Sequence, residues 1–291
     1  MRLAFLGTPE ASIVSLRALV RAGHDVAIVI TRPDRRRGRG GELSASPVKL
    51  AARELGLRVS DQIGDLDGLG LECGVVVAYG ALIRAAVLER VPMLNVHFSL
   101  LPRWRGAAPV ERAILAGDEV TGVSVMSLEV ALDTGPVHLA RPLAVGERTA
   151  SELTRELANL GAAALIEVLA SPELMSSPRA QAGSATYAEK LTTETYHLVP
   201  AMDRVTMLRT VRLERAFAFV NGRRLRVLRA HADAMTHRGM GTLQVREGNI
   251  YLVGADGAIA LDDVQREGAK AMPASAWWAG ARLDGVDVRW S

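Results

Sequence analysis

CGVVVAYG at residues 73–80 and MLNVH at residues 93–97 are two short apolar runs that decide the fold class of this chain. Both have the length and composition of buried strands. RLAFLG at 2–7 and DVAIVIT at 25–31 repeat the pattern, and helical segments alternate with these runs along the chain. Such alternation is typical of an open, mostly parallel, twisted α/β sheet with helices on both faces.

Helix end signals support this interpretation. In SPVKLAARELG we expect Ser46 to be the N-cap, Pro47 to be the first helical residue and Gly56 to follow the last turn. Further elements are predicted as a helix that ends near Gly23, strands at 122–128 and 136–143, and helices at 108–117 and 151–170. Residues 32–45 are expected to form a loop without structure of its own. A first, α/β domain is therefore predicted over residues 1–170.

The pattern changes in the last third of the chain. Residues 171–201 contain Pro, Ser and Gly and are interpreted as a linker. In FAFVNGRRLRVLRA the Asn221-Gly222 pair lies between apolar runs, which is a strong hairpin signal. Short runs separated by glycine turns continue to residue 264 with no long helix. Residues 202–291 are therefore predicted to form a small β-barrel or sandwich.

Composition limits the class of protein. With 49% hydrophobic and 23% charged residues the chain is typical of globular proteins. The single cysteine, Cys73, excludes a disulfide framework and a cysteine-rich metal site, and we expect it to be a small buried residue. The start, MRLAFLG, is too short for a signal peptide, and no apolar run is long enough to span a membrane. We therefore expect a cytoplasmic protein without a metal.

Arginine is unevenly distributed, although the net charge is only +3. Residues 32–39 hold five arginines and one aspartate. Residues 203–229 hold eight arginines, at 204, 209, 212, 215, 223, 224, 226 and 229. Clustered arginine favours a polyanionic partner such as a nucleic acid. The alternative is an ordinary solvated surface.

The turns after the strands indicate which chemistry is possible. The first turn, LGTPE, lacks the G-x-G-x-x-G pattern of a dinucleotide site, and no Walker sequence is present. Ligands of open parallel sheets bind beyond the carboxyl ends of the strands. Asn95 and His97 end one strand and share a face by two-residue alternation, and Asp133 lies in the turn LDTG.

An amide, an imidazole and a carboxylate form a plausible acyl-transfer set. The amide and imidazole would stabilise an oxyanion, and the carboxylate would orient the imidazole. No serine or cysteine nucleophile is paired by motif, so direct attack by a substrate amine is the simpler mechanism. A structural Asn-x-His pair and an ordinary turn aspartate remain the alternative at this point.

Longer motifs resemble a known family. The stretch NVHFSLLPRWRGAAPVERAILAGD, followed by TGVSVM and LDTG, resembles the methionyl-tRNA formyltransferase family. FLGTPE, TRPDRRRGRGGELSASPVK, VVVAYG and TYAEKL match the same family in the same order over most of residues 1–195. The resemblance implies formyl transfer from 10-formyltetrahydrofolate to the methionine amino group of initiator methionyl-tRNA. It also implies a monomer with an OB-like C-terminal domain that binds tRNA.

The resemblance also implies roles for individual residues. Asn95 and His97 would hold and polarise the formyl oxygen, and Asp133 would tune His97. Trp104 would pack the turn or line the methionyl pocket. The folate contacts would be Val77, Ala78, Tyr79, Gly80, Leu82, Ser99, Leu100, Leu101, Pro102, Leu128 and Leu132. The tRNA contacts would be Arg35, Arg36, Arg37, Arg39, Arg103, Arg105, Arg223 and Arg224.

Some positions depart from the family pattern. AS follows GTPE where the family usually has an aromatic residue, and TTETYHLVP follows YAEKL in place of the usual Asp-Trp. Two other functions therefore stay open. One is a formyltransferase of the same fold that acts on an amino sugar nucleotide or another small amine. The other is a catalytically silent tRNA-binding homologue. Glycinamide ribonucleotide formylation fits less well, because enzymes of that type lack a second β domain.

Overall fold

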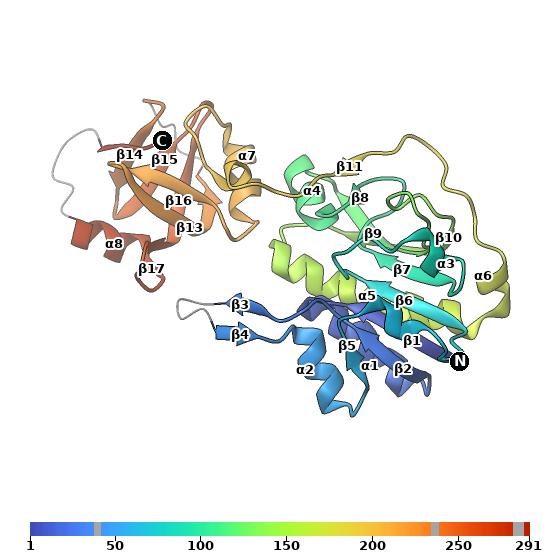
Figure 1. Cartoon of the computed structure of the whole chain (residues 1–291). Coiled ribbons are helices and arrows are strands. Elements are labelled where there is room, and N and C mark those ends of the chain that lie inside the picture. The colour runs from blue at the N-terminus through green and yellow to red at the C-terminus, as the bar shows by residue number, and fades with distance from the viewer. Residues whose placement is uncertain (38–41, 234–238, 282–287) are drawn as a thin grey trace. The chain divides into compact units, whose positions relative to one another are not determined.

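The computed structural model describes residues 1–37, 42–233, 239–281 and 288–291 (Figure 1). The chain forms two compact units. The first comprises residues 1–110, 119–145 and 153–189, and the second comprises residues 111–118, 146–152 and 190–291. The second unit therefore includes two short segments that come from within the α/β part of the sequence.

A seven-stranded sheet forms the centre of the first unit. From edge to edge its strands are β10 (Val137–Ala144), β9 (Val120–Ser127), β7 (Met93–His97), β6 (Cys73–Val77), β1 (Arg2–Gly7), β2 (Asp25–Ile30) and β5 (Val59–Ser60). The five strands from β7 to β5 are parallel, whereas β9 and β10 are antiparallel to their neighbours. The prediction of an open, mostly parallel sheet is confirmed.

Helices connect these strands. They are α1 (Glu10–Arg21), α2 (Pro47–Glu54), α3 (Ala85–Leu88), α4 (Pro109–Ala116), α5 (Ala150–Ala170) and α6 (Pro172–Ser176), with a 3₁₀ turn η1 at Ile63–Leu66. The predicted start of α2 is confirmed, because the Ser46 hydroxyl accepts from the Lys49 amide and Pro47 is the first helical residue. Gly56 follows the helix with φ +69°.

Different parts of the chain cover the two faces of the sheet at β7. Gly161 of α5 lies so close to β7 that a Cβ there would come within 2.6 Å of Val96 Cγ1. The long helix therefore covers the face to which Val96 points. Met93 points to the other face and belongs to a buried cluster with Leu6, Ile30 and residues of the segment after β6.

The segment after β2 differs from its prediction. Residues 32–45 contain two short strands, β3 (Arg35–Arg37) and β4 (Glu42–Ser44), which pair in antiparallel register. The expectation of a loop without its own structure is therefore wrong, because the backbone at both ends of the segment satisfies its hydrogen bonds as a ribbon. Arg39 lies in 38–41, outside the described residues.

A barrel-like antiparallel sheet forms the second unit. Its strands run β12 (Phe217–Val220), β13 (Arg223–Ala232), β16 (Ala258–Arg266), β15 (Asn249–Val253), β14 (Thr242–Arg246) and β18 (Val288–Arg289), and β17 (Met272–Pro273) pairs with β16. The end of the chain connects the two edges: Trp290 bridges to Val220, and Phe219 N–H donates to the Ser291 carbonyl over 2.6 Å. The sheet is thus nearly closed, as a barrel requires.

Turns and helices complete this unit. Asn221 and Gly222 both have positive φ, +48° and +71°, as a two-residue hairpin turn demands. The predicted hairpin is confirmed. Two eight-residue helices were not predicted: α7 (Arg204–Val211) and α8 (Ala274–Ala281). The segment interpreted as a linker contains α6, β11 (Tyr187–Ala188) and the 3₁₀ turn η2 (Glu194–Tyr196). Among the described residues no helix is long and apolar enough to cross a membrane.

Cys73 begins β6 and is buried, as expected. Burial raises the pKa of its thiol to about 11. At pH 8 about one thiol in a thousand is then ionised, and the thiolate is the reactive form. We therefore expect no alkylation of the folded protein by iodoacetamide at pH 8, and complete alkylation in urea, measured by mass spectrometry. Rapid modification of the folded protein would show that β6 opens readily.

Candidate active site

Asn95 and His97 lie on the last residues of β7 and are buried, with 8% and 6% of their surface exposed. Strand alternation places both on the face to which Met93 points, opposite to α5. Because β7 is parallel to β6 and β1, its carboxyl end lies at the same edge of the sheet as the ends of those strands. The two side chains thus lie at the edge where open α/β sheets bind ligands.

Asp133 comes to His97 from the turn between β9 and β10. Its carboxylate Oδ2 lies 3.6 Å from His97 Nδ1, and both side chains are buried. The same Oδ2 accepts a hydrogen bond from the Gly106 N–H at 2.8 Å. Asp133 has φ +52°, a left-handed conformation that is uncommon outside glycine. The structure therefore brings His97 and Asp133 together across 36 residues of sequence.

The imidazole of His97 is held on both sides. Its Nε2 lies 2.8 Å from the Trp104 carbonyl, which can only accept, so Nε2 is the donor. Nδ1 faces the Asp133 carboxylate, which also accepts. Both ring nitrogens therefore point to acceptors, and these two contacts fix the orientation of the ring.

Unlike the His97 ring, the Asn95 amide is not held by hydrogen bonds to the described residues. Within the described part of the chain, no hydrogen bond uses the Asn95 side chain, although the residue is buried. The Asn95 amide is not among the fully enclosed polar groups without a partner in the described residues, so a ligand can reach it. A substrate oxygen at the sheet edge would supply a partner.

The loop after β7 is fixed by residues that are remote in sequence. Ser124 of β9 donates to the Ser99 carbonyl at 2.8 Å and accepts from the Leu101 amide at 3.1 Å. Thr186 Oγ1 accepts from the Trp104 amide at 2.9 Å. Sequence reasoning missed both residues; the motif TYAEKL, which begins at Thr186, was the available signal.

Two short parallel strands also hold the loop after β7 in place. Strand β8 (Arg105–Gly106) pairs with β11, and the Ala188 carbonyl accepts from the amides of Ala107 and Ala108. Gly106 has φ +122°, and a Cβ at this position would lie 2.7 Å from the Ala188 carbonyl oxygen. Only glycine permits this approach, which aims the Gly106 N–H at Asp133.

The segments predicted to bind folate lie around the same face. Leu128 packs against the cluster that contains Tyr79 and Ile83. Leu82 is 83% exposed and Leu132 is 53% exposed, so both present apolar surface to solvent. Ala78 and Gly80 are also exposed.

Other residues predicted to bind folate are buried or half-buried within the fold. Val77 and Ser99 are fully buried. The Val77 carbonyl accepts from the Ser12 hydroxyl, and the Ser99 hydroxyl donates to the Arg103 carbonyl. Leu100, Leu101 and Pro102 are half-buried.

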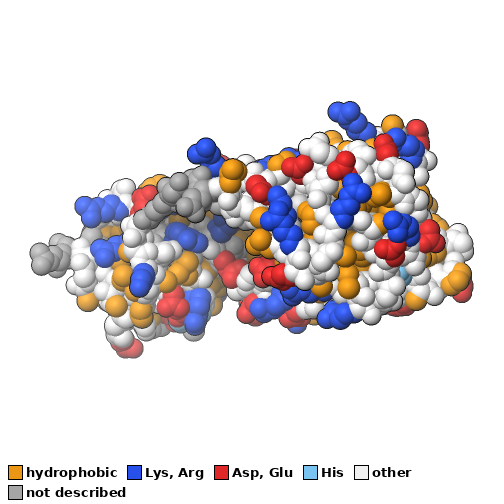
Figure 2. Space-filling view, turned by 60° about the horizontal axis from the view of Figure 1, so that its bottom comes forward, with side chains coloured by type: hydrophobic (Ala, Val, Ile, Leu, Met, Phe, Trp, Pro, Cys, Tyr) orange, Lys and Arg blue, Asp and Glu red, His pale blue; other side chains and the backbone are white. Residues whose placement is uncertain are grey.

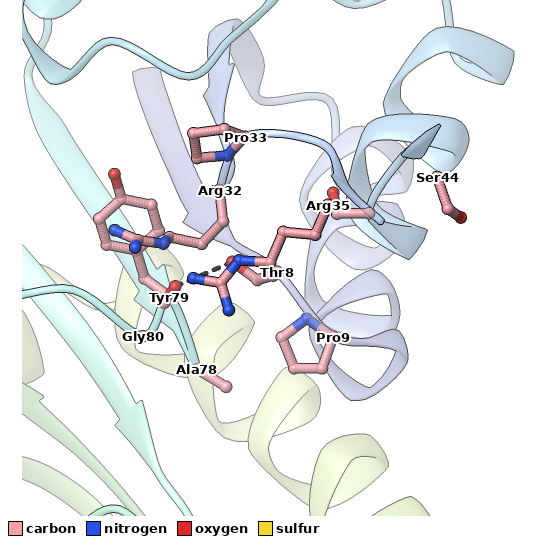
Figure 3. Close-up of a pocket in the computed structure, with 10 residues that line it drawn as sticks. Thr8, Pro9, Arg32, Pro33, Arg35, Ser44, Ala78, Tyr79 and Gly80 are labelled. Carbon is pink, nitrogen blue, oxygen red and sulfur yellow. Dashed lines mark hydrogen bonds between the residues drawn. The ribbon is translucent and has the colours of Figure 1, made fainter. Parts of the chain in front are cut away.

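A pocket lies beside β1, β2 and β6, where the strand order reverses direction (Figure 3). Its volume is about 220 Å³. Figure 3 shows Arg35 reaching toward Thr8, whose hydroxyl donates to the Tyr79 carbonyl at 2.8 Å. Burial raises the pKa of the Tyr79 hydroxyl, and the positive charge of Arg32 opposes this effect. Two guanidinium groups and an aromatic ring suit an anionic or nucleotide group.

The remaining predicted arginines are in varied surroundings. Arg36 is exposed, whereas the Arg37 side chain and all of Arg39 are outside the described residues. Arg103 lies over the Trp104 ring at 4.6 Å, and Arg224 lies over the Phe217 ring at 3.8 Å. Arg223 is exposed at the start of β13. Arg105 donates to Gln181 through Nε and NH2.

One face of the molecule carries charges of both signs. On the face that Figure 2 shows, Lys and Arg side chains protrude between acidic ones. The basic groups on this face are therefore local clusters and form no continuous band.

Sequence comparison places the chain in a known family. Residues 1–169 match the formyl transferase family, and residues 205–282 match the formyl transferase C-terminal domain. A methionyl-tRNA formyltransferase of Novosphingobium aromaticivorans is 40% identical over 98% of this chain and 98% of its own length. One of Rhizorhabdus wittichii is 41% identical over 94% and 93%. The chain belongs to the methionyl-tRNA formyltransferase family.

Solved structures share the fold at lower identity. HypX from Aquifex aeolicus in complex with tetrahydrofolic acid aligns with 99% of this chain and 50% of its own, at a TM-score of 0.68 and 18% identity. Methionyl-tRNA formyltransferase from Clostridium thermocellum aligns with 80% of this chain and 94% of its own, at a TM-score of 0.57 and 18% identity.

We expect Gly106→Ala to reduce formyl transfer sharply. The new Cβ would clash with the Ala188 carbonyl and move the N–H that holds Asp133. Loss of a hydrogen bond to a charged group costs about 1.5–3 kcal/mol, which corresponds to a rate about 10- to 100-fold lower. Single-turnover rates measure this effect.

Gly248→Ala, in the second unit, is the matched control. Gly248 also has positive φ, +82°, but its added Cβ would meet nothing within 4 Å. It carries the backbone strain without the clash, so its rate should stay close to that of the unaltered protein. Equal losses in both variants would contradict the role assigned to the close approach at Gly106.

Proposed function

We propose that the protein transfers the formyl group of 10-formyltetrahydrofolate to the α-amino group of methionine on initiator methionyl-tRNA, in the cytoplasm. The observation that carries this proposal is the 40% identity to a methionyl-tRNA formyltransferase over 98% of both chains. The contact between His97 and Asp133 at the ligand-binding edge of the sheet supports it.

In the proposed mechanism the chain stabilises charge and supplies no nucleophile. The methionine amine attacks the formyl carbon directly, and negative charge develops on the formyl oxygen. The tetrahedral intermediate then collapses as the bond from the formyl carbon to folate N10 breaks, and the proton lost by the amine ends on N10. Asn95 donates to this oxygen from its amide, which has no partner within the described part of the chain. Once the substrate replaces the Trp104 carbonyl as the partner of Nε2, His97 donates to the same oxygen or moves the amine proton, and Asp133 holds the ring from its Nδ1 side. Such a donor contributes about 2.7–4 kcal/mol to lowering the barrier.

The folate ring system is proposed to lie against the segments after β6 and β9. Leu82 and Leu132 are exposed there and offer apolar surface beside the buried site. Covering this surface would remove it from water at about 25 cal/mol per Å². Such binding places the formyl group next to Asn95 and His97.

The tRNA acceptor end is proposed to approach through the β3–β4 segment. Arg35 lines the pocket at the end of β1 and Arg36 is exposed beside it. Arg223 and Arg224, on the second unit, would contact other phosphates of the tRNA. Each neutralised phosphate adds about 0.7–0.9 to the log–log salt slope.

Substrate choice is tested by offering four acceptors to the enzyme loaded with 10-formyltetrahydrofolate. These are initiator methionyl-tRNA, elongator methionyl-tRNA, free methionine and an amino sugar nucleotide. We expect fast single-turnover transfer to the initiator alone. Transfer to an amino sugar nucleotide instead would favour that alternative substrate. Tight tRNA binding without any transfer would favour the silent homologue.

Two substitutions test the catalytic residues. We expect Asn95→Ala to lower kcat about 10²- to 10³-fold, since one oxyanion donor is lost. Asp133→Asn keeps the shape but removes the charge, and we expect a loss of about 10²-fold or more. The Tm and the Kd for tRNA should change little. Asn159→Ala, in an exposed position on α5, is the control. Full activity in both site variants would refute the assignment.

Two arginines test the tRNA contact. We expect Arg35→Gln with Arg36→Gln to raise the KM for tRNA at unchanged kcat and to flatten the salt dependence by up to about 1–2 in log–log slope. Arg17→Gln with Arg53→Gln removes the same charge from exposed positions on α1 and α2. An equal effect in this control pair would mean that net charge alone attracts tRNA.

A further inference from the structure

Gln181 joins the two loops that surround Asp133. It lies between α6 and β11 and is half-buried. Its Nε2 donates two hydrogen bonds of 2.8 Å, one to the Asp133 carbonyl and one to the Gly135 carbonyl. A primary amide nitrogen has two hydrogens, so both are used.

The other end of the same amide is also occupied. Gln181 Oε1 accepts from Arg105 Nε at 3.1 Å and from Arg105 NH2 at 2.7 Å. Arginine can only donate and backbone carbonyls can only accept. The two kinds of partner therefore fix which end of the amide is oxygen and which is nitrogen. Glutamate could keep the arginine bonds but would present an acceptor to two carbonyls.

These bonds act on a strained turn. Asp133 has φ +52°, and a residue other than glycine holds this conformation only when its surroundings impose it. Gln181 binds the carbonyl of Asp133 and that of the second residue after it. The turn is thus held at two points, and the direction of the Asp133 side chain follows from its backbone.

Arg105 connects Gln181 to the residue that binds the Asp133 carboxylate. Arg105 precedes Gly106, whose N–H donates to the Asp133 carboxylate. The Arg105 amide is itself bonded to the Thr186 carbonyl at 2.9 Å. Gln181 therefore connects the backbone on both sides of the carboxylate that faces His97.

We propose that Gln181 is a positioning residue of the active site, which sets the Asp133 carboxylate against His97 through the 133–135 turn and through Arg105. The hydrogen bonds of its amide go to Arg105 and to the carbonyls of Asp133 and Gly135, so it acts through these residues. This inference rests on the proposed catalytic role of Asp133.

The test compares Gln181→Glu and Gln181→Met with the unaltered enzyme. We expect both variants to lower the single-turnover rate at saturating folate and tRNA about tenfold or more. The KM for initiator tRNA should change less than about twofold, because the hydrogen bonds of the amide are all made within the protein. A loss confined to KM, or no loss at all, would overturn the proposal.

Gln265→Glu is the matched control, since Gln265 is bonded in the same way in the second unit. It accepts from Arg226 NH1 at 3.0 Å and donates to the Ala269 carbonyl at 2.9 Å. We expect this variant to lose a similar amount of thermal stability and to keep its single-turnover rate. If rate followed Tm equally in both variants, Gln181 would have only a structural role.

A double-mutant cycle tests the route through Arg105. We expect Arg105→Ala to lower the rate as well, and the double variant with Gln181→Met to be no slower than the worse single variant. Independent, multiplying losses would show that Gln181 does not act with Arg105. Asp133→Asn separates the two hypotheses: full activity in it refutes the proposed site, whereas inactivity there with full activity in Gln181→Met refutes this inference alone.

Discussion

The hydrogen bond from the Gly106 N–H to the Asp133 carboxylate is the contact on which the site depends. It joins the loop after β7 to the turn between β9 and β10, and neither loop belongs to the regular sheet. The bond forms because Gly106 adopts a φ of +122° against the Ala188 carbonyl. The returning segment that contains β11 therefore decides where the carboxylate lies, although it contributes no reacting group.

The sheet supplies the rigid half of the arrangement. Gly161 lets α5 approach Val96 closely, which fixes β7 and directs Asn95 and His97 to the opposite face. The antiparallel strand β9 then places Ser124 opposite His97, where its hydroxyl holds the start of the loop. Polar groups near the reacting atoms are thereby held by strands, and strands position side chains more accurately than loops do.

Several features of the fold and the site can be predicted from the sequence, whereas others cannot. The strands, the cap at Ser46, the Asn221-Gly222 hairpin and the shared face of Asn95 and His97 are local consequences of periodicity and turn chemistry. Gln181 and Thr186 could not be found in this way, because they lie 48 residues from Asp133 and 82 residues from Trp104. They lie in a segment without hydrophobic periodicity. A polar residue in such a segment cannot be distinguished from an ordinary surface residue until its partners are known.

The partner of Arg105 could not be predicted from its charge either. Its position in a basic motif favours a phosphate contact, yet its guanidinium donates twice to a neutral amide. An arginine bonded directly to Asp133 would compete with His97 for the carboxylate, since charged donors form the stronger hydrogen bonds. With Gln181 as the acceptor, the guanidinium is occupied and Asp133 is held by a backbone N–H. The carboxylate then accepts from this N–H and faces the imidazole without a competing guanidinium.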